Sequence, residues 1–286
     1  MAIDRVGVVG GGQMGAGIAE VCAKGGCDVI IFEISDAAAD AARGKLAASL
    51  GKALKNEKID QATHDATLAR LRVTTEFSDL ADRQFVFEAV AENLDVKEKI
   101  FKDLGATVTD PEAIFATNTS SIPVIQVAMA CSRPESVLGL HFFNPPTVMK
   151  LVEVIPSLLT DASVTDRARD FVGNTLGKTT ILSKDRSGFV VNALLAPFLV
   201  NAIRMYEAGF ASAEDIDTGV QLGLSHPMGP LTLCDMIGLD TIHAVAESLY
   251  EEFREPTYAP PPLLTRMVQA GMLGRKSGRG FYDYSS

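Results

Sequence analysis

Cysteine and long apolar runs are both scarce in this sequence, and their scarcity limits what the protein can be. The four cysteines are Cys22, Cys27, Cys131 and Cys234. They form no C-x-x-C pair and no cysteine–histidine spacing typical of a metal site, so we expect free thiols in a reducing compartment and no bound metal. The longest apolar stretch, residues 188–203, is broken by Asn192, Pro197 and Asn201 and is short for a membrane span.

Positive charge is also in short supply. The chain has 26 lysines and arginines against 36 acidic residues, a formal net charge of −10. This balance argues against nucleic acid or an anionic membrane as the main partner. Any anionic ligand must therefore meet local positive charge or backbone N–H groups. The first residues, MAIDRVGVVGGG, enter a strand pattern without the basic and apolar parts of a secretion signal, so we expect a cytoplasmic protein.

Short apolar runs alternate with helical patterns in the N-terminal part of the chain. Strands are predicted at residues 5–9, 28–33, 85–90, 113–117 and 137–142, with helices between them such as 13–24 and 95–104. This alternation is typical of βαβ units and predicts a parallel sheet covered by helices on both faces. A charged helical hairpin, predicted over residues 37–72, follows the second strand as an insertion that would cap or cover a binding cleft.

From Ser187 onward the strand pattern gives way to helices. They are predicted at residues 189–206, 213–222, 230–253 and 263–270. We place the boundary at the polar segment 183–188, which separates an α/β domain at residues 1–185 from an all-α domain at residues 186–286. The helix over residues 189–206 is apolar on most of its circumference, so we expect it to be buried, partly against another subunit.

A glycine motif, G-x-G-x-x-G, occupies residues 10–15 between the first predicted strand and the first helix. Gly10 permits a tight turn, Gly12 lets the backbone approach a pyrophosphate, and Gly15 lets the helix pack closely on the strand. The helix that begins with Gln13 and Met14 offers N–H groups and a positive dipole end to the phosphates. The N-terminal domain is therefore predicted to be Rossmann-like and to bind a dinucleotide.

Glu33 ends the second predicted strand, 23 residues after Gly10. A carboxylate at this place accepts hydrogen bonds from the ribose hydroxyls of adenosine and repels a 2′-phosphate. Ile34 and Ser35 follow without an arginine, so the sequence favours NAD over NADP. The alternative is that Glu33 is an ordinary solvated residue at a strand end.

Three further segments carry a more specific pattern. They are AENL at residues 91–94 with Lys97, NTSS at 118–121, and HFFNPP at 141–146 followed by KLVEV at 150–154. In these segments, and in SGFVVN at 187–192, HPMGP at 226–230 and GFY at 280–282, the sequence resembles the 3-hydroxyacyl-CoA dehydrogenase family. The resemblance covers essentially the whole chain, and it is to the free-standing dehydrogenase.

The resemblance implies NAD-dependent oxidation of (S)-3-hydroxyacyl-CoA to 3-oxoacyl-CoA and the reverse reduction. We expect a short-chain substrate such as 3-hydroxybutyryl-CoA, in butanoate or fatty acid metabolism. Two other readings stay open: a dehydrogenase of free 3-hydroxy acids, which relies on a helical lysine, and a non-catalytic NAD-binding protein.

The resemblance further implies a catalytic set of His141, Glu153, Ser120 and Asn192. A secondary alcohol that loses hydride needs a base for its hydroxyl proton, and histidine has a pKa near neutrality. His141 would be this general acid/base, and Glu153 would fix its tautomer and stabilise the imidazolium. Ser120 would hydrogen-bond the reacting oxygen, and Asn192 would hold or polarise the substrate carbonyl region. Ser121, beside Ser120, is a possible helix cap, and the sequence alone does not separate the two serines.

The remaining assignments concern ligand contacts. The resemblance places Glu92, Lys97, Asn144 and Lys276 along the cofactor, near its ribose and nicotinamide. The family also contacts CoA through a serine and a lysine of the hairpin. Ser49 matches the serine, but Asn56 occupies or adjoins the lysine position, so we consider Lys52 and Lys55 as the candidates. These lysines would supply the local positive charge that an anionic ligand needs. The resemblance also implies a homodimer formed through the C-terminal domain.

Overall fold

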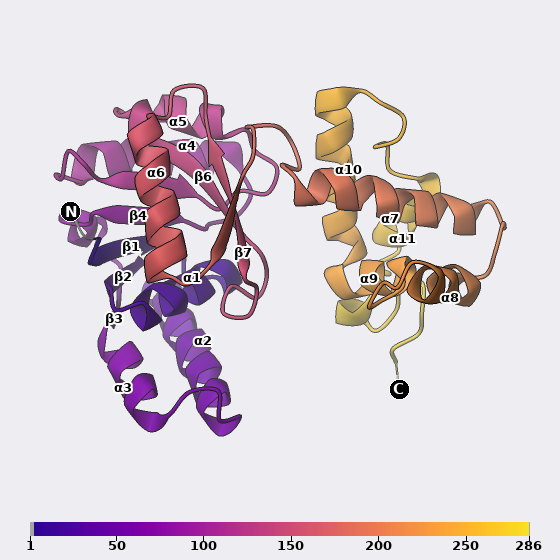
Figure 1. Ribbon diagram of the computed structural model, residues 1–286, viewed down its shortest axis with the longest axis horizontal. Helices are drawn as coiled ribbons and strands as arrows, with labels where there is room; N and C mark the ends of the chain where they lie inside the picture. Colours follow the sequence, from indigo (N-terminus) through magenta and orange to yellow (C-terminus); the bar gives the residue numbers. More distant parts are fainter. Residues whose placement is uncertain (1–2, 286) are drawn as a thin grey trace. The chain divides into compact units, whose positions relative to one another are not determined.

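The computed structural model describes residues 3–285, and the chain divides into two compact units between Arg186 and Ser187. The N-terminal unit is built on a sheet of eight strands in the order β3-β2-β1-β4-β5-β6-β7-β8 (Figure 1). Its strands are β1 (Arg5–Val9), β2 (Asp28–Phe32), β3 (Leu71–Thr74), β4 (Phe85–Glu88), β5 (Ile114–Thr117), β6 (Val137–Phe142), β7 (Leu151–Pro156) and β8 (Thr179–Leu182). Its helices are α1 (Gln13–Lys24), α2 (Asp36–Lys55), α3 (Gln61–Ala69), α4 (Leu94–Thr107), α5 (Val124–Ala130) and α6 (Ala162–Asp170).

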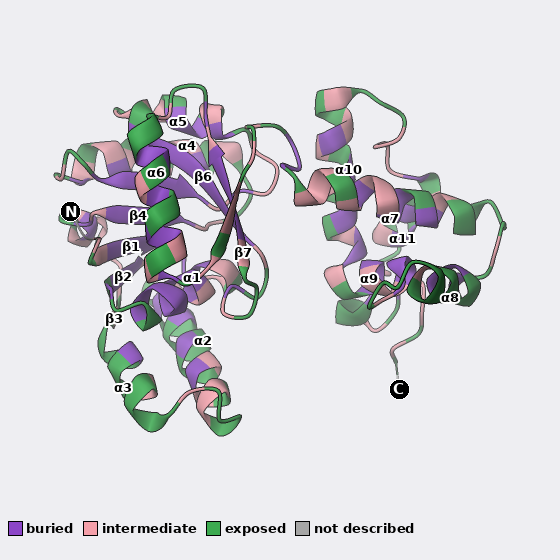
Figure 2. Ribbon diagram, in the orientation of Figure 1, coloured by how far each residue is buried: buried purple, intermediate pink, exposed green. Residues whose placement is uncertain are grey.

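The predicted parallel sheet is confirmed from β3 through to β6. β7 then runs antiparallel to β6, and β8 runs parallel to β7, a reversal that the sequence pattern did not indicate. The central strands are buried on both faces, as Figure 2 shows, because helices cover the sheet on either side. The edge strands β3 and β8 are only partly buried and carry several polar residues, which explains why apolar periodicity did not reveal them.

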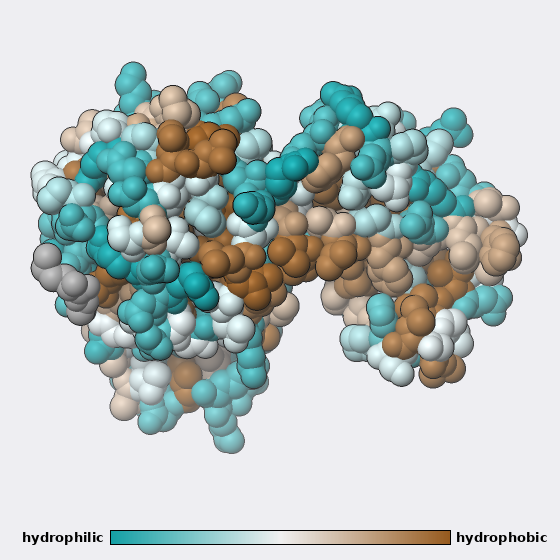
Figure 3. Space-filling model, turned by 45° about the horizontal axis from the view of Figure 1, so that its top comes forward, coloured by the Kyte–Doolittle hydropathy of each residue, from teal (hydrophilic) through white to brown (hydrophobic). Residues whose placement is uncertain are grey.

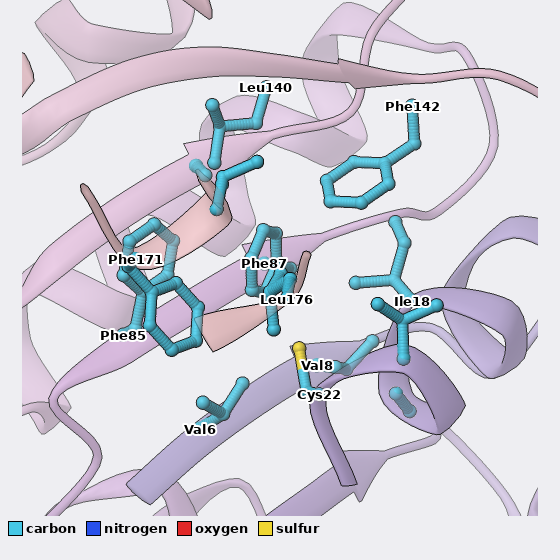
Figure 4. Packing of buried hydrophobic residues seen from close by; sticks show 14 of the residues in the cluster. Val6, Val8, Ile18, Cys22, Phe85, Phe87, Leu140, Phe142, Phe171 and Leu176 are labelled. Carbon is cyan, nitrogen blue, oxygen red and sulfur yellow. The ribbon is translucent and has the colours of Figure 1, made fainter. Parts of the chain in front are cut away.

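The core of the N-terminal unit lies in two layers, one on each face of the sheet. On one face α1 and α6 pack on a cluster that includes Phe85, Phe87 and Phe171 (Figure 4). The centroid of the Phe85 ring lies 4.7 Å from that of the Phe87 ring and 5.1 Å from that of the Phe171 ring. On the other face α4 and α5 pack on a second cluster around Phe101 and Phe115. Side chains that alternate along each buried strand feed both layers, so the sheet is held rigidly under its loops.

The predicted helical hairpin after β2 is formed by α2 and α3. Each helix has a side-chain cap: Ser35 accepts a hydrogen bond from the Ala38 N–H, and Asp60 accepts one from the Thr63 N–H. The hairpin ends at Ala69, however, and Leu71 and Arg72, predicted as its last residues, instead begin β3.

The C-terminal unit is helical, as predicted. Its helices are α7 (Val191–Glu207), α8 (Ala213–Gly223), α9 (Pro230–Ile237), α10 (Leu239–Phe253) and α11 (Pro262–Gln269). The single helix predicted over residues 230–253 is wrong, because Gly238 adopts φ +105° and separates α9 from α10. That conformation favours glycine and breaks the helical hydrogen-bond ladder.

The expectation that the helix over residues 189–206 is mostly buried is only partly met. α7 begins at Val191, and its buried side chains within the unit include Leu199, Val200 and Ile203, whereas Leu194 is 73% exposed. Among the described residues, no helix combines the length and apolar character that crossing a bilayer requires.

Candidate active site

The glycine motif forms the turn from β1 into α1, and Gly10 and Gly15 are needed there sterically. Gly10 has φ +93°, and a Cβ on it would lie 2.9 Å from the Ala89 carbonyl oxygen. A Cβ at Gly15 would lie 1.8 Å from the Gly10 carbonyl oxygen, so only glycine lets α1 pack on the turn. Gly12, the N-cap of α1, has open space around it and no side-chain cap. The first N–H groups of α1 are thus available to a pyrophosphate, and the turn fits a dinucleotide.

Glu33 follows β2 and its side chain reaches this turn. Its Oε1 accepts a hydrogen bond of 2.6 Å from the Gly11 N–H. Ile34, the next residue, is 86% exposed. The carboxylate is therefore fixed beside the dinucleotide turn with no arginine following it, which suits a ribose diol rather than a 2′-phosphate.

His141 and Glu153 face each other across β6 and β7. The antiparallel register pairs these two residues directly, and His141 Nδ1 lies 2.6 Å from Glu153 Oε2. Glu153 is fully buried and His141 nearly so, with the Phe143 ring 4.6 Å from the imidazole. A buried carboxylate at this distance favours the tautomer that carries a proton on Nδ1 and stabilises a protonated ring.

Glu92 holds the backbone of the segment at residues 118–121. Its Oε1 accepts hydrogen bonds from the Thr119 hydroxyl, from the N–H groups of Ser120 and Ser121 at 3.0 and 3.1 Å, and from the Ser121 hydroxyl. Burial raises the pKa of the Glu92 carboxyl, but the charge of Lys97 and these hydrogen bonds outweigh it and hold the pKa below the usual range. Glu92 is thus an ionised anchor for the loop that carries Ser120.

The two serines differ in what their hydroxyls do. The Ser121 hydroxyl donates to Glu92, and the N-terminus of α5 is capped by Asp185, which accepts hydrogen bonds of 2.8 Å from the N–H groups of Val124 and Ile125. Ser121 is therefore not the helix cap that the sequence allowed. The Ser120 hydroxyl makes no hydrogen bond within the described part of the chain and remains the candidate for a substrate contact.

Lys97, a predicted cofactor contact, is completely buried. Its Nζ lies 2.7 and 2.8 Å from the two oxygens of Glu88 and 3.4 Å from Glu92 Oε2. The Thr117 hydroxyl also donates to Glu88. Sequence reasoning missed Glu88, and the available signal was a carboxylate at the end of an otherwise apolar strand, FVFE, with a lysine nine residues later. A buried acid in such a strand requires a buried partner.

A cavity of about 360 Å³ lies among α1, α2 and the segment that follows β6. Gln13 and Asn144 line it and are joined by a hydrogen bond of 3.1 Å between Gln13 Nε2 and Asn144 Oδ1. Ser49 lines it as well, but the predicted Lys52 and Lys55 do not, whereas Lys45 does. The structure thus brings together one predicted cofactor residue of α1, one of the HFFNPP segment and the predicted CoA-binding serine.

Pro146 fixes the position of this segment against α1. A Cβ at Gly17 would lie 2.8 Å from Pro146 Cδ, so the proline packs on the bare backbone of the helix. The Lys178 ammonium donates to the carbonyl oxygens of Pro146 and Met149 at 2.7 and 2.8 Å. These contacts hold the connection between β6 and β7, which carries Asn144 between His141 and Glu153.

Two predicted site residues belong to the C-terminal unit. Asn192 lies half-buried in the first turn of α7. Lys276 forms an ion pair with Asp240, with Nζ–Oδ distances of 2.5 and 2.6 Å, at the start of α10. Within the described residues no cluster of three histidine, cysteine or acidic side chains is arranged to hold a metal.

The fold and the site together define a class. Two features are typical of a dinucleotide-dependent oxidoreductase. One is a glycine turn that leads into a helix without a side-chain cap and lies beside an acid at the end of β2. The other is a buried histidine–glutamate pair near the carboxyl end of β6. Residues 5–186 match the family model for the 3-hydroxyacyl-CoA dehydrogenase NAD binding domain, and residues 188–284 match the model for its C-terminal domain. The chain belongs to the 3-hydroxyacyl-CoA dehydrogenase family and is an NAD-dependent enzyme of that family. These matches confirm the family and the cofactor that the sequence predicted.

Individual relatives match over their full lengths. The chain is 54% identical over 283 residues to a 3-hydroxybutyryl-CoA dehydrogenase of Mycobacterium tuberculosis, with 99% of each sequence covered. The crystal structure of M. tuberculosis FadB2 matches with a TM-score of 0.98 and 54% identity, covering 99% of this chain and all of that one. The structure of (S)-3-hydroxybutyryl-CoA dehydrogenase PaaH1 from Ralstonia eutropha matches with a TM-score of 0.94 and 46% identity, with both chains covered completely.

Proposed function

We propose that this protein interconverts (S)-3-hydroxybutyryl-CoA and acetoacetyl-CoA, with His141 as the general acid/base. The observation that carries the proposal is the 2.6 Å contact between His141 Nδ1 and Glu153 Oε2 in a buried pair. The substrate is supported by the names of the relatives that are 54% and 46% identical over whole chains.

In the oxidation, bound NAD supplies the acceptor for the hydride that leaves C3. His141 takes the 3-hydroxyl proton on Nε2, because its Nδ1 proton is directed at Glu153. Glu153 stabilises the imidazolium that results, and in the reduction the same imidazolium returns the proton to the oxygen. Ser120 donates a hydrogen bond to the reacting oxygen, and Asn192 orients the thioester carbonyl. Glu92 contributes by holding the backbone on both sides of Ser120.

Cofactor contacts are assigned to Gly10, Gly12, Gln13, Met14 and Gly15 at the turn, and to Glu33 at the ribose. Asn144 and Lys276 are assigned to the nicotinamide side, with Glu92 and Lys97 as the pair that shapes its surroundings. Ser49 is assigned to the CoA moiety. Lys52 and Lys55, farther along α2, are the candidate lysines, because Asn56 occupies or adjoins the position of the family's lysine. The open space at Gly12 and the carboxylate beside Gly11 support the turn assignments.

We further propose a homodimer in a reducing, cytoplasmic compartment. The C-terminal unit exposes large apolar side chains, and Figure 3 shows brown, hydrophobic areas on one face of that unit. They are Val190, Leu194, Met205, Tyr206, Phe210, Leu222, Leu224 and Met236. Exposed apolar surface of this extent favours a subunit interface. The buried free thiols of all four cysteines support the reducing compartment.

The test is the initial rate of NADH oxidation at 340 nm with acetoacetyl-CoA, 3-oxohexanoyl-CoA and 3-oxodecanoyl-CoA. We expect the highest kcat/KM with acetoacetyl-CoA, a decline with chain length, and little activity when NADPH replaces NADH. Free acetoacetate is the control for a dehydrogenase of free acids. Turnover of the longer thioesters above that of acetoacetyl-CoA would contradict the short-chain assignment, and activity on the free acid alone would contradict the thioester.

A further inference from the structure

The loop that carries Ser120 runs from the end of β5 to the start of α5, and its two ends are held in different ways. At the first end Glu92 accepts hydrogen bonds from the N–H groups of Ser120 and Ser121. The second end is the first turn of α5, which follows Pro123. Proline has no side-chain acceptor, and α5 has no cap from its own N-cap residue. The first N–H groups of α5 therefore need an acceptor from elsewhere in the chain.

Asp185 supplies that acceptor from 60 residues beyond Ile125 in the sequence. Its Oδ1 accepts a hydrogen bond of 2.8 Å from the Val124 N–H, and its Oδ2 accepts one of 2.8 Å from the Ile125 N–H. Asp185 is half-buried and follows the edge strand β8, whose last residue, Leu182, pairs with Val154 of β7. Two hydrogen bonds to an ionised carboxylate are stronger than two neutral ones. The start of α5 is thus tied to the segment that leaves the edge of the sheet.

The start of α5 also packs on the strand that carries His141. Val124 is completely buried, and a Cβ on Gly139 of β6 would lie 2.9 Å from Val124 Cγ2. Gly139 and His141 lie on the same face of β6, because side chains alternate along a strand. The loop that carries Ser120 therefore ends over β6, beside His141. A shift of the first turn of α5 would move the end of this loop relative to the imidazole.

We propose that Asp185 is a positioning residue for the reaction: it holds the first turn of α5 and thereby fixes the Ser120 hydroxyl relative to His141. This inference rests on the proposed function, in which both side chains meet the same substrate oxygen. Asp185 acts through the backbone of α5 and contributes no group to the chemistry. The reacting oxygen must meet the Ser120 hydroxyl and His141 Nε2 at once, so a displacement of about 1 Å lowers the rate more than it weakens binding.

The first measurement is the kcat of Asp185→Ala with acetoacetyl-CoA and NADH. We expect kcat to fall about 10- to 100-fold. KM for NADH should stay unchanged, because the glycine turn and Glu33 are held by other contacts. Asp185→Asn keeps one acceptor oxygen and should recover part of the loss.

Asp110→Ala is the matched control. Asp110 is also half-buried and accepts a backbone hydrogen bond, of 2.9 Å from the Glu112 N–H, but it lies before β5, at the end of that strand away from Ser120. Both alanine variants should lower Tm by about 2 to 4 °C, as expected for the loss of a hydrogen bond. Only Asp185→Ala should lower kcat.

A double-mutant cycle separates positioning from a general loss of structure. If Asp185 acts through Ser120, Asp185→Ala should lower kcat by less than about threefold in a Ser120→Ala background. The same cycle with Asp185→Asn applies where the alanine variant does not fold. Equal losses with and without the Ser120 hydroxyl, or an unchanged kcat in Asp185→Ala, would overturn the inference. Absence of acetoacetyl-CoA reduction by the unmodified enzyme, or an unchanged kcat in Ser120→Ala, would instead count against the proposed function.

Discussion

His141 and Glu153 depend on each other because both are buried. A fully buried carboxylate needs a hydrogen-bond donor, and the His141 ring supplies one at 2.6 Å. In return the carboxylate sets the ring tautomer and leaves proton exchange to the other ring nitrogen. The Phe143 ring packs 4.6 Å from the imidazole and limits its rotation. The pair therefore has the fixed geometry that the proposed acid–base chemistry at the substrate oxygen requires.

Glu153→Gln tests this pair at the scale of one residue. The amide keeps the shape of the side chain but no longer stabilises an imidazolium, so we expect kcat to fall by about 10²- to 10⁴-fold. Initial rates at 340 nm measure the loss, and NADH fluorescence titration is expected to show unchanged cofactor affinity. His141→Gln should lose a similar factor. Turnover within a few-fold of the unmodified enzyme in either variant would rule out the proposed acid–base role.

Glu88 and Lys97 connect several elements beneath the same site. Glu88 ends β4, Lys97 lies on α4, and the Thr117 hydroxyl at the end of β5 donates to Glu88. Lys97 also approaches Glu92, which holds the backbone of Ser120 and Ser121. An ion pair joins the sheet to the loop that carries the candidate substrate contact.

Lys97→Met is expected to destabilise the protein by about 3 to 5 kcal/mol, because it leaves a buried carboxylate without its partner. Urea denaturation followed by circular dichroism measures the change. The double variant Glu88→Gln/Lys97→Met removes both charges and should recover a substantial part of the stability. A single variant as stable as the unmodified protein would show that the pair is not held as tightly as its distances of 2.7 and 2.8 Å indicate.

At the scale of elements, the sequence predicted buried strands well and edge strands poorly. β1 and β6 have the predicted bounds, since a run of apolar residues is required for burial on both faces. β3 and β8 pair on one side only, carry several polar residues and gave no apolar signal. The break at Gly238 was also missed, because an isolated glycine inside a helical pattern does not reveal a positive φ.

For the whole molecule, the apolar surface of the C-terminal unit leads to a prediction about assembly. Light scattering is expected to give a molar mass of twice the chain mass of 30.5 kDa. Leu194→Asp places a charge on the exposed face of α7 and should weaken self-association by about tenfold or more, as for a residue in the core of an interface. Leu158→Asp, at a residue 91% exposed in the N-terminal unit, is the matched control. A monomeric unmodified protein at micromolar concentration would contradict the dimer.

The sequence by itself determined which chemical groups this enzyme has. The glycines at positions 10, 12 and 15 and the acid at position 33 reflect local requirements, namely a tight turn and a strand end, which are visible without long-range information. The HFFNPP segment carries the family resemblance from which the role of His141 is proposed. The family, the cofactor and the division into α/β and all-α parts followed from the same local patterns and from the resemblance that they carry.

Only the tertiary structure decided which of these groups meet. The antiparallel pairing of β6 with β7 has the register that puts Glu153 opposite His141. A register is a property of two strands rather than of either one. Lys97 is buried against Glu88, and Lys45 and Glu20 line the cavity that Ser49 also lines. Both arrangements depend on how the helices pack. A charged residue has the same local pattern in water and in a buried pair, so its partner is known only once the chain has folded.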